Sequence, residues 1–117
     1  MANNKNFKVK NGLVAIRYLQ TGVAMAANDV DLSLGSYFTK TISGATTLTF
    51  SNPPASGLAI GFTVEINGDG SAITWPSSVK WPEGVAPTAA SSKELYAFVT
   101  TDGGTSYYGK KVAEGIA

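Results

Sequence analysis

Eight carboxylates are the residues of this 117-residue chain that could carry out acid–base chemistry. A glycosidase would need two of them to converge across a cleft with pKa values pushed apart. Asp69 and Asp102 stand in glycine-rich turns, where aspartate is common, and Asp29 and Asp31 lie on the polar side of an alternating stretch. We therefore assign no catalytic residue among Asp29, Asp31, Glu65, Asp69, Glu83, Glu94, Asp102 and Glu114.

The chain contains no cysteine and no histidine. Thiolate nucleophiles, zinc sites built on sulfur or imidazole, and the usual general base are therefore excluded. Asn67-Gly68-Asp69-Gly70 has oxygen ligands for calcium, but the spaced acidic ligands and the closing glutamate of a calcium loop are missing, which favours a turn. No nucleophile elbow or phosphate-binding glycine loop occurs. The prediction is a protein that is not an enzyme and holds no metal or cofactor.

Aromatic residues offer a second kind of chemistry, a flat platform for a sugar ring. A small β-domain also needs large aromatics to seal its core, and we expect this packing role for Trp75. Tyr107 and Tyr108 are adjacent on an expected strand and must face opposite ways, so for them both roles stay open. Trp81 belongs to the same Trp-Pro loop as Trp75. A carbohydrate-binding module that recognises host glycans is therefore the alternative function.

Composition limits the remaining classes of function. The length suits one domain, and nine basic against eight acidic groups give a formal net charge of +1. Such a balance predicts no binding of nucleic acid, for which Lys8, Lys10, Lys110 and Lys111 are too few. The polar N-terminus and the apolar stretch interrupted by Arg17 predict neither a signal peptide nor a membrane span.

Period-two alternation predicts strands through most of the chain. The strongest case is Leu58–Asn67, which we expect to form a hairpin with Ser71–Trp75 across the Asn-Gly-Asp-Gly loop. Near the N-terminus, Asn11-Gly12 predicts a hairpin of Phe7–Lys10 with Leu13–Leu19. A short amphipathic helix from Leu13 to Gln20 is the alternative, disfavoured by its flanking glycines and its β-branched residues.

Further strands are expected at residues 29–34, 37–43 and 46–50, and the first two segments are either two strands or one strand bent at Gly35. Glu94–Thr101 reads as a strand covered on both faces, and it should form a closing hairpin with Thr105–Gly109 across Asp102-Gly103-Gly104. The tail from Lys110 onward is expected to be peripheral or frayed. The regular spacing of turn signals predicts an all-β fold, an antiparallel β-sandwich or jelly-roll-like domain at residues 26–117, preceded by a β-hairpin arm at residues 1–25.

Four segments carry a resemblance to a known kind of protein: Asp31–Ile42, Thr49–Pro54, Ile73–Pro82 and Phe98–Gly104. They resemble a module of virion structural proteins from tailed bacteriophages, especially marine ones, often within tail-fibre-like chains. The opening Phe7–Leu13 is similar to the starts of phage appendage proteins. The resemblance implies a building block of a tail fibre or a protein that decorates the capsid, located in the virion and assembled in the bacterial host cytoplasm. It transfers no functional residue.

The low charge and the alternating N-terminal segment suit a many-copy subunit, because pairing with neighbours would satisfy exposed backbone groups. We therefore expect Phe7–Leu19 to contact neighbouring subunits in a homo-oligomer, a trimer or higher, alongside other virion proteins. Neither nucleic acid nor membrane is an expected partner, whereas a host glycan is a possible one.

Overall fold

A computed structural model describes residues 8–117. Within them the chain is all-β apart from one 3-10 turn, η1 (Pro82–Gly84). The main sheet has the strand order β1-β3-β6-β9-β10-β8, and two further pairs, β2-β5 and β4-β7, form short ladders of their own. The strands are β1 (Gly22–Ala24), β2 (Asp29–Asp31), β3 (Tyr37–Thr41), β4 (Thr46–Thr47), β5 (Thr49–Ser51), β6 (Ile60–Asn67), β7 (Ile73–Thr74), β8 (Val79–Lys80), β9 (Lys93–Thr100) and β10 (Tyr107–Ile116).

Parallel pairing dominates the first two thirds of the body. β1 pairs with β3 and β3 with β6, while β2 pairs with β5 and β4 with β7, all in parallel. The chain from β1 to β7 therefore winds as a coil, and each pass lays a strand beside the equivalent strand of the pass before. Antiparallel pairing is confined to the β6-β9 and β9-β10 pairs. The all-β prediction is confirmed, but the predicted antiparallel arrangement is wrong for the coil.

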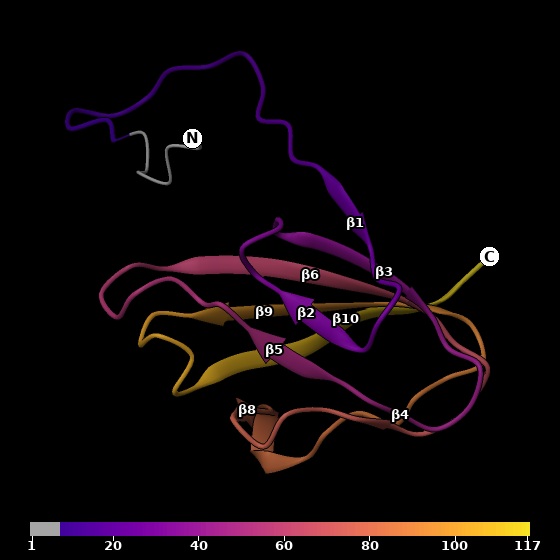
Figure 1. The fold of residues 1–117 in the computed structure, drawn as a ribbon. Coiled ribbons are helices and arrows are strands. Elements are labelled where there is room, and N and C mark those ends of the chain that lie inside the picture. Colours follow the sequence, from indigo (N-terminus) through magenta and orange to yellow (C-terminus); the bar gives the residue numbers. More distant parts are fainter. Residues whose placement is uncertain (1–7) are drawn as a thin grey trace.

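One face of the main sheet holds the core. Alternation in β6 buries Phe62, Val64 and Ile66, as its period-two pattern predicts. Val30 of β2 belongs to the same hydrophobic cluster, as does Trp75 directly after β7, and Phe50 of β5 and Ile73 of β7 pack against it. In Figure 1, β2 and β5 lie in front of the main sheet, consistent with this packing. The other face of the main sheet is not covered in this way.

The predicted hairpin of Leu58–Asn67 with Ser71–Trp75 is wrong. Leu58 is exposed and β6 begins at Ile60, while β6 pairs with β3 and β9 rather than with β7. The loop after β6 carries the chain out of the main sheet, because β7 joins the ladder with β4. Gly68 makes this path possible, since a Cβ there would lie only 2.2 Å from the Ala90 carbonyl oxygen.

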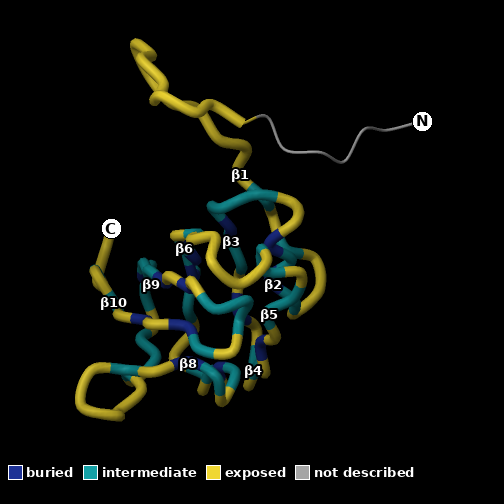
Figure 2. Tube along the Cα trace, turned by 90° about the vertical axis from the view of Figure 1, so that its left-hand side faces the viewer, coloured by how far each residue is buried: buried dark blue, intermediate teal, exposed yellow. Residues whose placement is uncertain are grey.

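The predicted N-terminal hairpin is also wrong for the residues that can be seen. Phe7 lies outside the described residues, and residues 8–21 form neither strand nor helix. Every residue from 8 to 22 is exposed, and Figure 2 shows this arm leaving the body beyond β1. An isolated two-stranded hairpin is marginally stable at best, and no large apolar side chain from Leu13 to Leu19 is buried on the body. β1 falls inside the range expected for the arm, yet it joins the main sheet.

The closing hairpin is confirmed and is longer than expected. β9 and β10 pair from Tyr108 opposite Val99 to Ile116 opposite Lys93, with bulges near the C-terminal end of β10. The tail expected to fray therefore belongs to β10. β9 is not covered on both faces as predicted: Tyr96 and Phe98 are buried, whereas Val99 on the opposite face is exposed.

Candidate functional site

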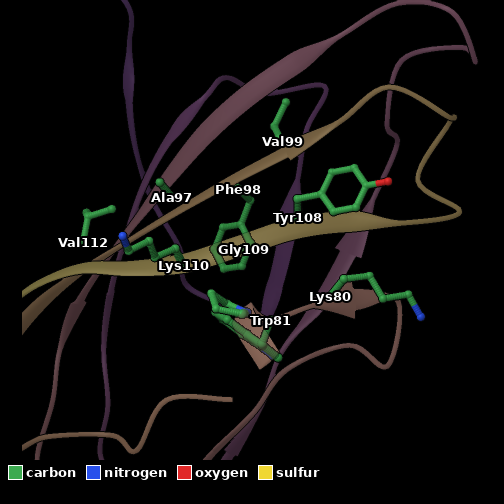
Figure 3. A pocket seen from close by; sticks show the side chains of 10 residues that line it. Lys80, Trp81, Ala97, Phe98, Val99, Tyr108, Gly109, Lys110 and Val112 are labelled. Carbon is green, nitrogen blue, oxygen red and sulfur yellow. The ribbon is translucent and has the colours of Figure 1, made fainter. Parts of the chain in front are cut away.

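An apolar groove opens beside the outer edge of β10. Figure 3 shows Tyr108, Lys110 and Val112 along β10, with Ala97 and Val99 on β9 and Trp81 on the other side. The groove has a volume of about 550 Å³. Lys80 and Lys110 carry its charges, and most of its remaining lining is hydrocarbon or aromatic. Such a surface favours an apolar partner over a small polar molecule.

Strand pairing explains why the groove is open. β8 pairs with β10 only at Tyr107 and Tyr108, after which the chain turns into η1 and leaves the sheet. The outer edge of β10 beyond Tyr108 has no other strand partner in the described part of the chain. Gly109 lets the backbone of β10 lie close to the Phe98 ring at the base of the groove, because a Cβ there would come within 2.7 Å of that ring.

The aromatic residues singled out from the sequence divide as the alternation predicts. Tyr107 is 3% exposed in the core and Tyr108 is 57% exposed in the groove, so only Tyr108 can meet a ligand. Trp75 is buried, with its ring centroid 4.7 Å from that of Tyr96, which confirms its packing role. Trp81 is half-buried and has both a packing and a surface role, since it packs edge-on to Phe98 and also lines the groove.

Most of the carboxylates accept hydrogen bonds from residues in nearby turns or on neighbouring strands. Asp29 accepts a hydrogen bond of 2.7 Å from the Thr49 hydroxyl and links β2 to β5. Asp31 accepts bonds from Ser33 and Asn52, which together hold the pKa of its carboxyl below the usual value.

The glycine-rich turns use their aspartates in the same way. The backbone N–H of Ser71 donates to Asp69 and that of Ser106 donates to Asp102, and each bond lowers the pKa of the carboxyl it reaches. The prediction of a turn at residues 67–70 agrees with the Asp69–Ser71 bond. In residues 8–117, no group of three or more acidic side chains is placed to hold a metal ion.

Glu65 and Glu83 lie apart from these turns. Glu65 accepts a hydrogen bond of 2.7 Å from the Tyr37 hydroxyl and lies 3.6 Å from the Lys93 ammonium. The bond to Glu65 raises the pKa of Tyr37. Glu83 is exposed in η1, where its φ of 58° is in the left-handed region.

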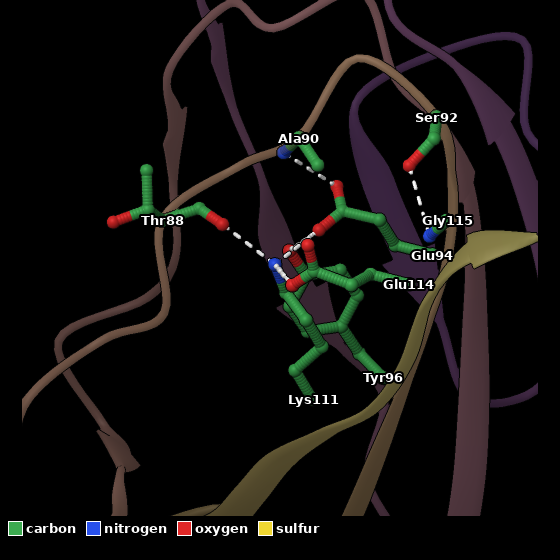
Figure 4. Close-up of polar contacts among 8 residues, drawn as sticks. All are labelled: Thr88, Ala90, Ser92, Glu94, Tyr96, Lys111, Glu114 and Gly115. Carbon is green, nitrogen blue, oxygen red and sulfur yellow. Dashed lines mark hydrogen bonds and ion pairs between the residues drawn. The ribbon is translucent and has the colours of Figure 1, made fainter.

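One carboxylate is different, because Glu94 is completely buried (Figure 4). Its oxygens accept bonds from the Ala90 N–H at 3.1 Å and the Tyr96 hydroxyl at 3.0 Å, and they form an ion pair with Lys111. The Lys111 ammonium also donates to the Thr88 carbonyl at 2.6 Å and lies 3.1 Å from Glu114. This cluster, which we call the Glu94 clasp, ties the loop before β9 to the closing hairpin.

The clasp is held together by charge. Burial lowers the pKa of Lys111, but the hydrogen bonds to Glu94 and Glu114 outweigh it and raise that pKa overall. Burial, reinforced by the neighbouring Glu94 charge, raises the pKa of Tyr96 as well. Ammonium and phenol are thus the stable forms at neutral pH, and a paired, protonated lysine is a poor nucleophile. The clasp is a structural element.

Sequence reasoning assigned no role to the clasp, although a signal was present. Glu94, Tyr96 and Phe98 are alternate residues of β9, so all three point to the buried face of that strand. Lys111 likewise lies on the same face of β10 as Tyr107 and Gly109. A charged residue in phase with a buried row requires a partner of opposite charge, and two such residues on paired strands indicate each other.

The described residues contain no helix that is long and apolar enough to cross a membrane. Comparison of the chain with known protein families, with curated proteins and with solved structures yields no match.

Proposed function

We propose that this protein is a non-enzymatic structural subunit of a tailed-phage virion that acts by assembling with copies of itself. The observation that carries the proposal is the arm, residues 8–21. Its large apolar side chains are almost wholly in water while the body encloses a well-packed core. Soluble monomers rarely expose such a continuous apolar stretch, and those that do use it as an interaction site. The exposed set is Leu13, Val14, Ile16, Tyr18 and Leu19.

The phage assignment rests on the sequence resemblance. The resembling segments coincide with strands and turns, for example Ile73–Pro82 with β7 and β8, and Phe98–Gly104 with the end of β9 and its turn. They therefore describe a scaffold, which suits a tail component or a capsid-decorating protein. The virion is the proposed location, with assembly in the bacterial cytoplasm and other virion proteins as neighbours.

For the architecture we propose a β-sandwich in the broad sense. The main sheet forms one layer, and the β2-β5 and β4-β7 ladders, whose side chains share its core, form the other. The short ladders have few residues, so the second layer is much smaller than the first.

Deletion of Met1–Gln20 tests the assembly proposal. We expect the full chain to sediment as a trimer or larger species and the deleted chain to sediment as a folded monomer, because the body keeps its own core. Analytical ultracentrifugation gives the mass, and circular dichroism checks the fold. A full chain that stays monomeric at high concentration, or a deletion that leaves the oligomer unchanged, would falsify the proposal.

Carbohydrate binding is the second candidate, favoured by the exposure of Tyr108 beside Trp81 and two lysines. A glycan array should then give a signal that Tyr108→Ala removes and Lys93→Ala, which lies outside the groove, leaves intact. No signal on the array would reject this candidate.

A further inference from the structure

Two surfaces of the chain lack a packing or strand partner in the described residues, and their shapes and chemistry match each other. One is the arm, whose large apolar side chains from Leu13 to Leu19 are each at least 71% exposed. The other is the outer edge of β10 with the groove beside it. Backbone N–H and C=O groups along such an edge are free to pair with an added strand. The segment Leu13–Leu19 is seven residues long and alternates, which suits the open part of β10 after Gly109.

Side-chain chemistry matches the arm to the groove. In an extended strand Val14, Ile16 and Tyr18 share one face, and Arg17 lies on the other. The apolar face can therefore enter the groove while Arg17 stays away from Lys80 and Lys110. A sugar would need many hydrogen-bond partners, and this lining has few polar groups apart from the two lysines and the Tyr108 hydroxyl.

The position of the arm favours a contact between copies. The arm joins the body at β1, which is at one edge of the main sheet, and the groove lies toward the other edge, at β10 and β8. The base of the arm is also anchored, because the Ser36 hydroxyl donates to the Gln20 side chain. A contact from the β1 side of one copy to the β10 side of the next is head-to-tail, and such contacts close into rings when the rotation permits.

We propose that Leu13–Leu19 of one copy adds as a strand along the free edge of β10 in a neighbouring copy, with Val14, Ile16 and Tyr18 seated in the groove. This inference rests on the proposed function, because it requires that the protein assembles, and it names the surface that receives the arm.

Disulfide trapping tests the contact directly, because the natural chain has no cysteine. Ile16→Cys and Val112→Cys are placed on separate chains with different tags, co-expressed and oxidised. Each chain then has one cysteine, so a mixed disulfide joins two copies. We expect the mixed disulfide to form about tenfold more than in a control that pairs Ile16→Cys with Thr47→Cys, an exposed site on β4 outside the groove. Equal yields, or none, would overturn the inference, as would an arm that folds back on its own copy.

A charge placed in the groove gives an independent readout. Val112→Glu should convert the oligomer to a folded monomer, and Val85→Glu, at an exposed valine outside the groove, should not. If the full chain assembles through its arm while Val112→Glu still assembles, the groove inference is wrong and the proposed function stands. If the full chain never assembles, both fail. A further outcome would also overturn the inference: the protein binds glycans through Tyr108, and Val112→Glu does not change its oligomeric state. The groove would then be a carbohydrate site.

Discussion

The arm and the closing hairpin carry the same sequence pattern and have opposite fates. Leu13–Leu19 alternates and remains outside any sheet, whereas β9 and β10 alternate and pair with each other as antiparallel strands. The difference is what lies beneath them. β9 and β10 place Tyr96, Phe98 and Tyr107 in a shared core, while no side chain of residues 8–21 belongs to that core or packs against it. Alternation thus marks a segment able to be a strand, and burial decides whether it becomes one.

The largest effect should come from removing the charge that pairs with Glu94. Lys111→Met leaves the Glu94 carboxylate buried without its cation, which should lower the free energy of unfolding by about 3–5 kcal/mol. The neighbouring Lys110→Met is the matched control, because Lys110 is exposed in the groove lining, and it should change that energy by less than about 0.5 kcal/mol. Urea denaturation measures both. Equal effects would mean that the clasp contributes nothing to the hairpin.

A smaller loss of unfolding free energy should follow from adding a side chain at Gly109, where β10 lies close to Phe98. Gly109→Ala puts a methyl group against the Phe98 ring and within 3.0 Å of Val79, and should cost about 1–3 kcal/mol of unfolding free energy. Gly61→Ala on β6 is the control, because its Cβ would meet only the Phe98 carbonyl oxygen at an ordinary 3.8 Å. Thermal unfolding followed by circular dichroism compares the two. A Gly109→Ala variant as stable as Gly61→Ala would contradict the close packing.

Alkaline pH should loosen the clasp in a defined direction. Folding raises the pKa values of Lys111 and Tyr96 above their ordinary values of 10.5 and 10.0, so the folded state retains protons that the unfolded state releases. This stabilisation is complete below about pH 10 and is lost as pH rises through the folded-state pKa values. Urea unfolding at about pH 7 and about pH 11 should show the decline, and Lys111→Met should make it shallower. A stability that does not fall would be inconsistent with protons held by the clasp.

The smallest effect belongs to the arm. Val14→Ala should alter the free energy of unfolding by less than about 0.5 kcal/mol at dilutions where copies are dissociated, because Val14 is fully exposed. At concentrations that permit assembly, the same variant should weaken association. Chemical denaturation and sedimentation give the two quantities. A loss of more than about 1 kcal/mol in the dissociated chain would show that the arm packs on its own body.

The sequence located strands well and their partners poorly. The hairpin across Asp102-Gly103-Gly104 was predictable because a short glycine-rich turn joins two alternating segments, which makes the pairing local. The pairing of Tyr37 with Thr63 was not, since it joins residues far apart in the chain. The coil leaves no fixed period in the sequence, because its successive passes differ in length.

The candidate groove was predictable in one residue only. Alternation required Tyr107 and Tyr108 to face opposite ways, but nothing local said which of them enters the core. The groove depends on where β8 stops beside β10, and on Trp81 returning to that edge from a separate loop. For the Glu94 clasp, the alternation along β9 and β10 indicated that Glu94 and Lys111 lie on buried faces. The contact of Lys111 with the Thr88 carbonyl could not be predicted from the sequence, because Thr88 lies in a distant loop.

The sequence by itself determined the all-β class, the turns, the two-faced strands, and an arm rich in apolar side chains. The tertiary structure decided that the coil is parallel, that Glu94 of the clasp is buried, and that the arm and the edge of β10 beyond Tyr108 have no strand partner within the described chain. The physical reason is that side-chain alternation and turn geometry are properties of a few consecutive residues. Strand pairing and burial are instead set by the competition among all distant segments for one core.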